Sequence, residues 1–129
     1  MIYISNSSDG NGVINLTVGD DASIEINLTT DDGEKYVMGD NEQLVFNVRE
    51  KASEDSPLLI DLRSVFGSNE IVFSHDDTKD LSPGYYSAEV QFMTGDNKRI
   101  TVWPKIEGNG KTSQSNRKNF CLMSEVVYE

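Results

Sequence analysis

The sequence has few of the residues that build most catalytic and metal sites. It contains one cysteine and one histidine among 129 residues. A single cysteine excludes a disulfide within the chain and a zinc site made of several thiolates, and His75 has no second histidine with which to share a zinc ion. Cys121 stands between Phe120 and Leu122, a setting more typical of a small buried side chain than of a nucleophile.

Common catalytic motifs are also missing. The sequence has no GxSxG nucleophile elbow, no complete P-loop, no GxGxxG after a strand and no HExxH. Gly108–Thr112 is similar to the end of a phosphate-binding loop, but the earlier glycine is missing and no helix is predicted after it, so we assign it to a loop. The pairs Asp20-Asp21, Asp31-Asp32 and Asp76-Asp77 lack the alternating ligands and closing glutamate of a calcium loop, and indicate turns instead. We therefore expect no enzymatic activity, no cofactor and no bound metal.

Basic residues are scarce relative to acidic ones. The chain has 11 lysines and arginines against 22 aspartates and glutamates, which gives a formal net charge of −11. An acidic surface repels phosphate backbones and anionic lipids, so we expect neither nucleic acid nor a membrane surface as a partner. No apolar run approaches the roughly eighteen residues of a membrane span, and the first residues show no signal-peptide pattern.

Apolar and polar residues alternate along most of the chain. Alternation with Gly, Asp, Asn or Pro at the breaks is typical of half-buried strands. A single helical turn over Ser64–Asn69 is the one helical element that we expect. The spacing of the strands predicts one β-sandwich domain over residues 1–129, with roughly seven to nine antiparallel strands. The predicted strands are residues 2–4, 13–18, 22–28, 35–38, 44–49, 58–62, 71–75, 85–93, 98–103 and 120–128.

The segment Leu81–Tyr86, Leu-Ser-Pro-Gly-Tyr-Tyr, joins a proline turn to the longest alternating run. It resembles the tyrosine corner of immunoglobulin-like sandwiches, in which a buried tyrosine hydroxyl bonds to an upstream backbone group. We expect Gly84 and Tyr86 to form this structural corner, because Tyr86 shares parity with Val90 and Phe92. The alternative is an ordinary inward tyrosine after a turn. The predicted fold class is therefore all-β, an immunoglobulin-like antiparallel β-sandwich.

Tyr85 and Trp103 are the candidate binding aromatics. If Ile100 and Val102 point inward, Trp103 points outward at the end of its strand, and Tyr85 also has outward parity. An exposed aromatic pair could hold a sugar ring or a partner subunit. The alternative is that the loop beginning at Pro104 covers the tryptophan, since tryptophan is usually mostly buried.

Two segments, 5–12 and 104–119, are predicted to be flexible loops. Loops as long as the second are usually functional or disordered. A basic loop on an acidic domain could dock on the acidic face of a neighbouring copy, which is a hypothesis of self-association. The basic side chains of the second loop are Lys105, Lys111, Arg117 and Lys118.

Three groups of residues carry a resemblance to a known family. The first is Asp77-Thr78-Lys79-Asp80-Leu81 with Gly84 and Tyr86, followed after the hairpin by Ile100–Pro104. The second is Gly19-Asp20, Asp32-Gly33 and Gly39-Asp40, placed around the predicted strands 22–28 and 44–49. The third is Phe120–Tyr128, which contains Ser124-Glu125-Val126.

In this layout the chain from about residue 14 onward resembles the N-terminal β-sandwich of phage baseplate upper proteins and related tail-associated domains. The resemblance implies a virion component, made in the bacterial cytoplasm and held by other tail proteins. It offers no catalytic residue. The missing signal peptide and the missing disulfide agree with it.

We therefore expect a non-enzymatic structural or assembly protein of a phage or prophage tail. Its partners would be other virion proteins or a second copy, contacted through edge strands and loops. The alternative is a carbohydrate-binding or adhesion module, which would require export and an exposed pair of Tyr85 and Trp103.

Overall fold

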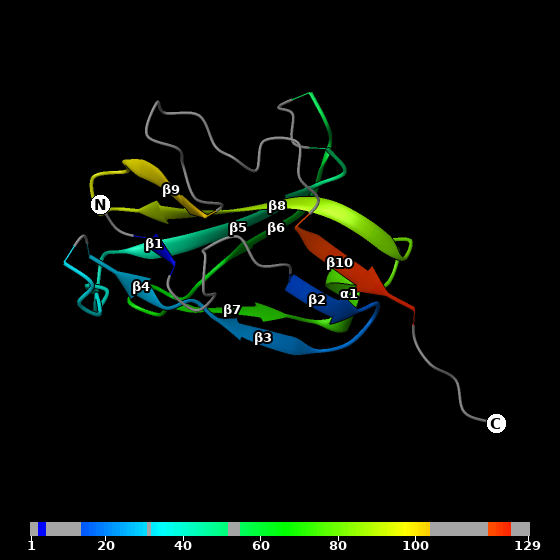
Figure 1. Ribbon diagram of the computed structural model, residues 1–129, viewed down its shortest axis with the longest axis horizontal. Helices are drawn as coiled ribbons and strands as arrows, with labels where there is room; N and C mark the ends of the chain where they lie inside the picture. The colour runs from blue at the N-terminus through cyan, green and yellow to red at the C-terminus, as the bar shows by residue number, and fades with distance from the viewer. Residues whose placement is uncertain (1–2, 5–13, 31, 52–54, 104–118, 125–129) are drawn as a thin grey trace.

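The structure, a computed structural model, describes residues 3–4, 14–30, 32–51, 55–103 and 119–124. These residues form ten strands and one four-residue helix, and the strands build two facing layers (Figure 1). The predicted all-β sandwich is confirmed, with two of its ten strands only two residues long. The elements are β1 Tyr3–Ile4, β2 Ile14–Thr17, β3 Ala22–Glu25, β4 Leu28–Thr29, β5 Gln43–Arg49, β6 Leu58–Arg63, β7 Glu70–Phe73, α1 His75–Thr78, β8 Gly84–Met93, β9 Arg99–Trp103 and β10 Phe120–Met123.

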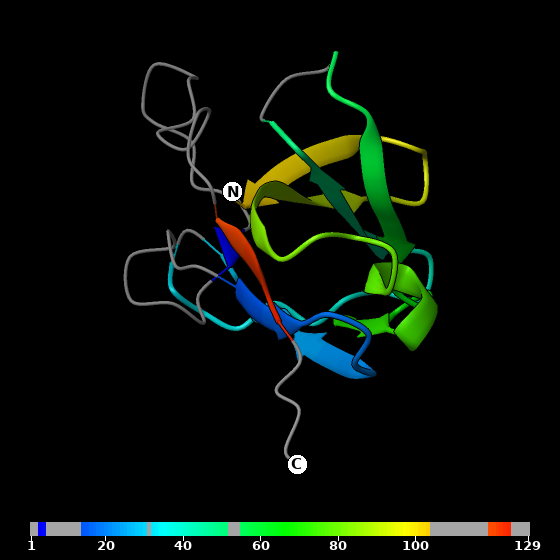
Figure 2. The same ribbon diagram turned by 90° about the vertical axis from the view of Figure 1, so that its right-hand side faces the viewer.

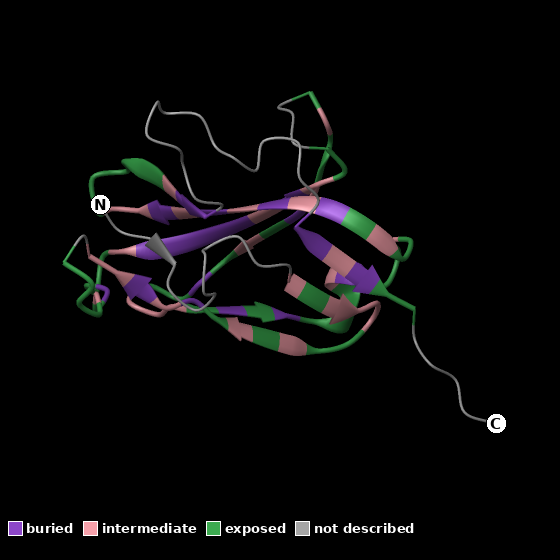
Figure 3. Ribbon diagram, in the orientation of Figure 1, coloured by how far each residue is buried: buried purple, intermediate pink, exposed green. Residues whose placement is uncertain are grey.

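The first layer is a six-stranded sheet with the long strand β8 at its centre. Its order is β2-β10-β8-β5-β6, and β9 also pairs with β8. The alternation predicted for β8 is confirmed, because every second residue from Tyr86 to Phe92 is buried (Figure 3). Those buried side chains are Tyr86, Ala88, Val90 and Phe92.

One strand pair of the large sheet is parallel. β2 runs parallel to β10, with Ile14 opposite Phe120, whereas the other strand pairs among the described residues are antiparallel. The prediction of a purely antiparallel sandwich is therefore wrong at this edge. Alternating burial is the same in parallel and antiparallel strands, so the sequence pattern does not distinguish the two directions.

Strands β9 and β10 run in the same direction along one edge of β8. The last pair of β9 joins Trp103 to Val90, and the first pair of β10 joins Phe120 to Tyr86. The two strands thus occupy successive stretches of the same edge. β5 pairs with the opposite edge of β8 over seven residues.

Asn119 bridges the interval between β9 and β10. Its Oδ1 accepts a hydrogen bond from the Ala88 amide at 2.7 Å, and its Nδ2 donates one to the Ala88 carbonyl at 3.0 Å. The Asn119 backbone amide also donates to the carbonyl of Tyr86 at 3.0 Å. Asn119 is only 2% exposed, and its side chain serves as a ladder partner for backbone groups that would otherwise be buried and unpaired.

The second layer consists of the antiparallel pairs β3–β7 and β1–β4. The predicted strand 22–28 is divided in two at Ile26, whose amide and carbonyl both bond to Asn69 rather than to a neighbouring strand. Figure 2 shows β2 and β10, which form one edge of the large sheet, along one side of the core, between the rest of that sheet and β3–β7.

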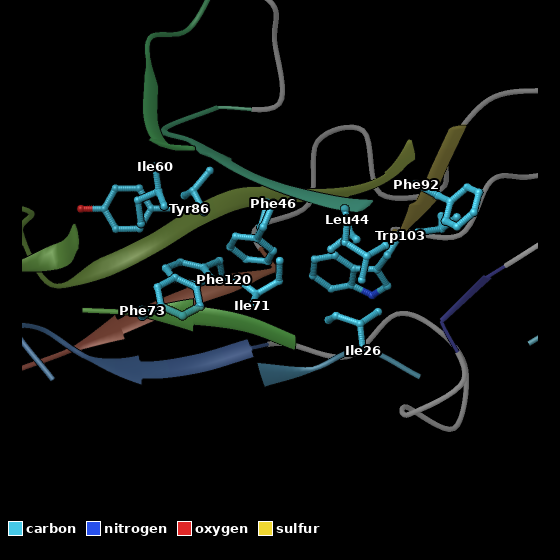
Figure 4. Close-up of a cluster of buried hydrophobic side chains, with 14 of the residues drawn as sticks. Ile26, Leu44, Phe46, Ile60, Ile71, Phe73, Tyr86, Phe92, Trp103 and Phe120 are labelled. Atoms are coloured by element: carbon cyan, nitrogen blue, oxygen red, sulfur yellow. The ribbon is translucent and has the colours of Figure 1, made fainter. Parts of the chain in front are cut away.

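A continuous apolar core fills the space between the layers (Figure 4). At its centre, Phe46 of β5 lies 5.5 Å from Phe73 of β7 and 5.9 Å from Phe120 of β10, measured between ring centroids. Leu44 and Ile26 lie at one end of the core, and Tyr86 lies at the other (Figure 4). The three rings tie the two layers and the parallel edge together.

The helical prediction is wrong in position. Residues 64–69 form a turn, in which Gly67 has a φ of +82° and the Ser68 amide donates to the Val65 carbonyl, a type II arrangement that requires glycine. The one helix among the described residues is α1, where the predicted strand 71–75 ends early. The predicted strand 35–38 is reduced to an isolated bridge between Lys35 and Thr29.

Candidate interaction surface

The expected tyrosine corner stands at the start of β8. The hydroxyl of Tyr86 donates a hydrogen bond to the carbonyl of Ser82 at 2.5 Å, and the ring is 9% exposed. Gly84 has a φ of +151°, which other residues rarely adopt. Burial, and secondly the charge of Glu50, raises the pKa of Tyr86. The predicted hydrogen bond is present, and it joins the loop after α1 to the large sheet.

Trp103 does not lie on the surface, so the prediction that it points outward is wrong and the tryptophan is buried, as the alternative expected. It is 4% exposed and lies beside Leu44 and Ile26 in the core (Figure 4). The cause is a bulge. Thr101 pairs with Gln91 of β8, and Trp103 pairs with Val90, which directly precedes Gln91 in the chain, so Val102 is an extra residue between the two pairs. One inserted residue reverses the parity of the strand residues after it, and Trp103 turns inward.

Tyr85 is 60% exposed, in agreement with its predicted parity. It lies opposite Cys121 on the outer face of the large sheet, and Met123, 46% exposed, follows on the same face of β10. Because Trp103 is buried on the inner face, Tyr85 and Trp103 do not form the aromatic pair that a sugar-binding platform would need. Tyr85 is thus left as the exposed aromatic of the two.

Three connections lie together at one end of the sandwich. Strands β5 and β9 begin there, and β6 and β8 end there, as the antiparallel registers require. This end is on the left in Figure 1. It carries the connection from β4 to β5, the β6–β7 turn (residues 64–69) and the β8–β9 hairpin. The connections come from distant parts of the sequence, and two of them, the β4–β5 connection and the β6–β7 turn, carry the exposed apolar side chains Val37, Val65 and Phe66.

The β6–β7 turn is bonded to the large sheet. Ser64 exchanges two hydrogen bonds with Leu44: its amide donates to the Leu44 carbonyl, and its Oγ accepts from the Leu44 amide, both at 2.9 Å. The Ser64 carbonyl accepts from Gln43 Nε2 at 2.7 Å, and the Gly67 amide donates to the Glu42 carbonyl at 2.8 Å. Ser64 and Gln43 are both buried. These bonds fix the turn on the first layer.

The same turn is bonded to the second layer. The Ile26 amide donates to the Asn69 carbonyl at 2.8 Å, and Asn69 Nδ2 donates to the Ile26 carbonyl at 2.9 Å. The turn is therefore held at both of its ends by different layers of the sandwich, and its backbone has little freedom to rearrange.

Two large apolar side chains project from this fixed turn. Val65 is 78% exposed and Phe66 is 60% exposed. Val37, in the neighbouring β4–β5 connection, is 78% exposed. Turn positions usually carry small or polar residues, and the turn is held here by its backbone, Ser64 and Asn69. The apolar pair is thus not needed to hold the turn. Sequence reasoning missed it, although two large apolar residues directly before Gly67 in a polar segment were a readable signal.

Hydrogen bonds to the Glu42 carboxylate order the β4–β5 connection beside this turn. The Tyr36 hydroxyl donates to the Glu42 carboxylate, at 2.7 and 2.8 Å from its two oxygens, and the Gly39 amide donates to the same carboxylate at 2.6 Å. Burial and the Glu42 hydrogen bond raise the pKa of Tyr36 to about 12. The Tyr36 ring packs edge-on against Phe92, with centroids 5.7 Å apart. The connection is thereby attached to the core.

The opposite end of the sandwich carries α1 and the single histidine. His75 Nδ1 lies 2.6 Å from the Gly19 carbonyl, and the His75 amide donates to Asp21 at 2.7 Å. The Gly19 amide donates to the buried hydroxyl of Thr78 at 2.8 Å. These contacts attach α1 to the β2–β3 turn, which gives His75 a structural role.

The predicted basic residues Lys105, Lys111, Arg117 and Lys118 lie outside the described residues, as do the predicted loop 5–12 and most of 104–119. In the part of the chain that the structure describes, no group of three or more His, Cys, Asp or Glu side chains could hold a metal ion. Within the same residues, no helix has the length and apolar character to cross a membrane.

Comparisons with family models, with curated proteins and with solved structures find no match to this chain.

Proposed function

We propose that this chain is a non-enzymatic structural or assembly protein of a phage or prophage tail, associated with the baseplate and acting through protein–protein contacts. The assignment to a phage particle rests on the resemblance of the sequence to the N-terminal sandwich of baseplate upper proteins. That the chain acts through contacts rests on the β6–β7 turn.

The observation that carries the contact function is the exposure of Val65 and Phe66 on a turn fixed to both layers. Exposed aromatic side chains on a rigid support are typical anchors of protein interfaces, because little conformational entropy is lost when they are buried. The tyrosine corner is consistent with the immunoglobulin-like sandwich that the resemblance implies.

Mass spectrometry of particles tests the proposal directly. Particles released by the bacterial strain that encodes the chain are purified on a density gradient and digested. The chain is expected among the stoichiometric tail proteins. A strain that releases no particles, or whose purified particles lack the chain, would overturn the assignment.

Self-association is a second mode of contact in such a particle, through Lys105, Lys111, Arg117 and Lys118 on the acidic face of another copy. Replacing these four residues by glutamate and measuring the mass in solution by light scattering tests it. A mass that falls to that of one chain supports the contact, and an unchanged mass removes it.

A carbohydrate-binding or adhesion module is the other function that suits a β-sandwich. The exposed pair of Tyr85 and Trp103 on which it depended is not formed, since Trp103 is buried. A glycan array probed with the purified chain would still decide against it if no sugar is bound.

A further inference from the structure

The partner of the β6–β7 turn can be described by its chemistry. The turn presents Val65 and Phe66 side by side at the tip between β6 and β7, with Val37 on the adjoining connection. A partner surface must therefore offer an apolar pocket that removes these side chains from water.

The charged side chains around the turn indicate which charges the rim of the partner's pocket should carry. Asp40 is exposed, and its Oδ1 lies 3.8 Å from where a Cβ on Gly67 would be. Glu70 is exposed at the start of β7, immediately after the turn. Arg63 is the one basic residue between positions 61 and 70. The border of the apolar tip is therefore mostly acidic, as is the chain as a whole, with its net charge of −11.

We propose that Phe66 and Val65 insert into an apolar pocket on a partner protein whose rim carries lysine or arginine residues facing Asp40 and Glu70. The inference rests on the proposed contact function of the turn and adds the chemistry of the partner. A basic rim complements the acidic border, speeds association and excludes partners with acidic surfaces. A second copy of this acidic chain would bring like charges together, and an anionic membrane would repel the same carboxylates.

Selection from a displayed library of randomised twelve-residue peptides tests the partner chemistry without knowledge of the natural partner. The immobilised full chain is the bait, and Phe66→Ser is the matched bait of a parallel selection that is not used to deplete the first. Because Phe66 is 60% exposed, this substitution leaves the core intact. The peptides enriched on the wild-type chain are expected to combine large apolar residues with a net positive charge.

Binding of the selected peptides is then measured on variants. Phe66→Ser should weaken it about tenfold or more, as truncation of an anchor residue does. The double variant D40N/E70Q should weaken it several-fold and reduce its dependence on salt. Val72→Ser, which removes another apolar side chain of 60% exposure on the outer face of β7, is the control and should leave binding unchanged.

Three results would overturn the inference: enriched peptides that bind Phe66→Ser equally well, enriched peptides without positive charge, or binding unaffected by D40N/E70Q. Sedimentation with phosphatidylcholine vesicles, with or without phosphatidylglycerol, gives a further arm, and binding that depends on Phe66 there would identify the tip as a lipid anchor instead. The particle experiment is independent of these measurements. A chain absent from particles that selects the expected peptides would overturn the phage assignment alone.

Discussion

Replacing Asn119 by alanine should destabilise the protein more than replacing an exposed asparagine. The side chain makes two hydrogen bonds to Ala88, and Asn119 is 2% exposed, so alanine leaves one buried N–H and one buried C=O without a partner. Each such group costs about 1–3 kcal/mol. Water that enters the edge of the sheet would recover part of this, and we expect a loss of about 2–4 kcal/mol in the free energy of unfolding.

The single tryptophan provides the assay. Trp103 is 4% exposed in the folded state, so its fluorescence should shift to longer wavelength when urea unfolds the chain. With a urea dependence of about 2 kcal/mol/M, the expected loss lowers the midpoint by about 1–2 M. Asn41→Ala, in the exposed turn before β5, is the control and should change stability by less than about 0.5 kcal/mol.

Asn119→Asp separates the hydrogen bonds from simple packing, because aspartate has nearly the same shape. At neutral pH its carboxylate can accept from the Ala88 amide, but it sets a second oxygen against the Ala88 carbonyl in place of the Nδ2 donor. Burial raises the pKa of such a carboxyl, and once protonated it can donate to the carbonyl. The difference in stability between this variant and the wild type should therefore shrink as the pH falls.

The reasoning would be refuted by an alanine variant whose urea midpoint lies within error of the wild type. It would be refuted equally by an aspartate variant that matches the wild type at pH 8. Either result would mean that the ladder between β9 and β10 does not depend on the Asn119 amide.

Three other measurements address the corner, the Tyr36 hydrogen bond and the split edge of the sheet. Tyr86→Phe removes the bond to Ser82 and should lower the free energy of unfolding by about 1 kcal/mol in urea, and an unchanged midpoint would contradict this role. The pKa of Tyr36, about 12 when folded against 10 ordinarily, means that unfolding releases protons between pH 10 and 12, so stability falls there as the pH rises, by at most about 3 kcal/mol. Tyr36→Phe should flatten that fall, and parallel pH profiles would contradict it. Deleting 104–116 leaves three residues between β9 and β10, the number that their registers on β8 require, and should preserve the tryptophan emission of the folded state; emission typical of the unfolded chain would count against it.

The sequence predicts the layers well because burial follows a period of two. Phe46 and Val90 face inward as expected, and the strand boundaries are mostly within two residues of those observed. The relative direction of paired strands, and the face to which a residue points after a bulge, are harder to predict from the sequence. A parallel pair has the same alternation as an antiparallel one, and a single extra residue, Val102, is enough to turn Trp103 from the surface into the core.

The candidate surface was not predicted, for a related reason. Residues 64–69 read as a helical turn, because hydrogen bonds to distant residues are invisible in a local pattern. Ser64 bonds to Leu44 and Asn69 to Ile26, and these contacts decide the conformation of the turn. Tertiary contacts of this kind override local propensity, so the exposure of Phe66 becomes clear only in the folded chain.

Two asparagines have the same structural role at two places where the ladder of strand hydrogen bonds is interrupted. Asn119 pairs with Ala88 where the large sheet passes from β9 to β10, and Asn69 pairs with Ile26 where the second layer passes from β3 to β4. In each case a side-chain amide, which carries both a donor and an acceptor, bonds to backbone at a point where the strand ladder is interrupted. At both interruptions the backbone groups of Ala88 and Ile26 are therefore hydrogen-bonded within the part of the chain that the structure describes. Changes to Val65, Phe66 or residues 104–116 should alter what the protein binds far more than whether it folds, and the stability of Phe66→Ser in urea is the direct check on that separation.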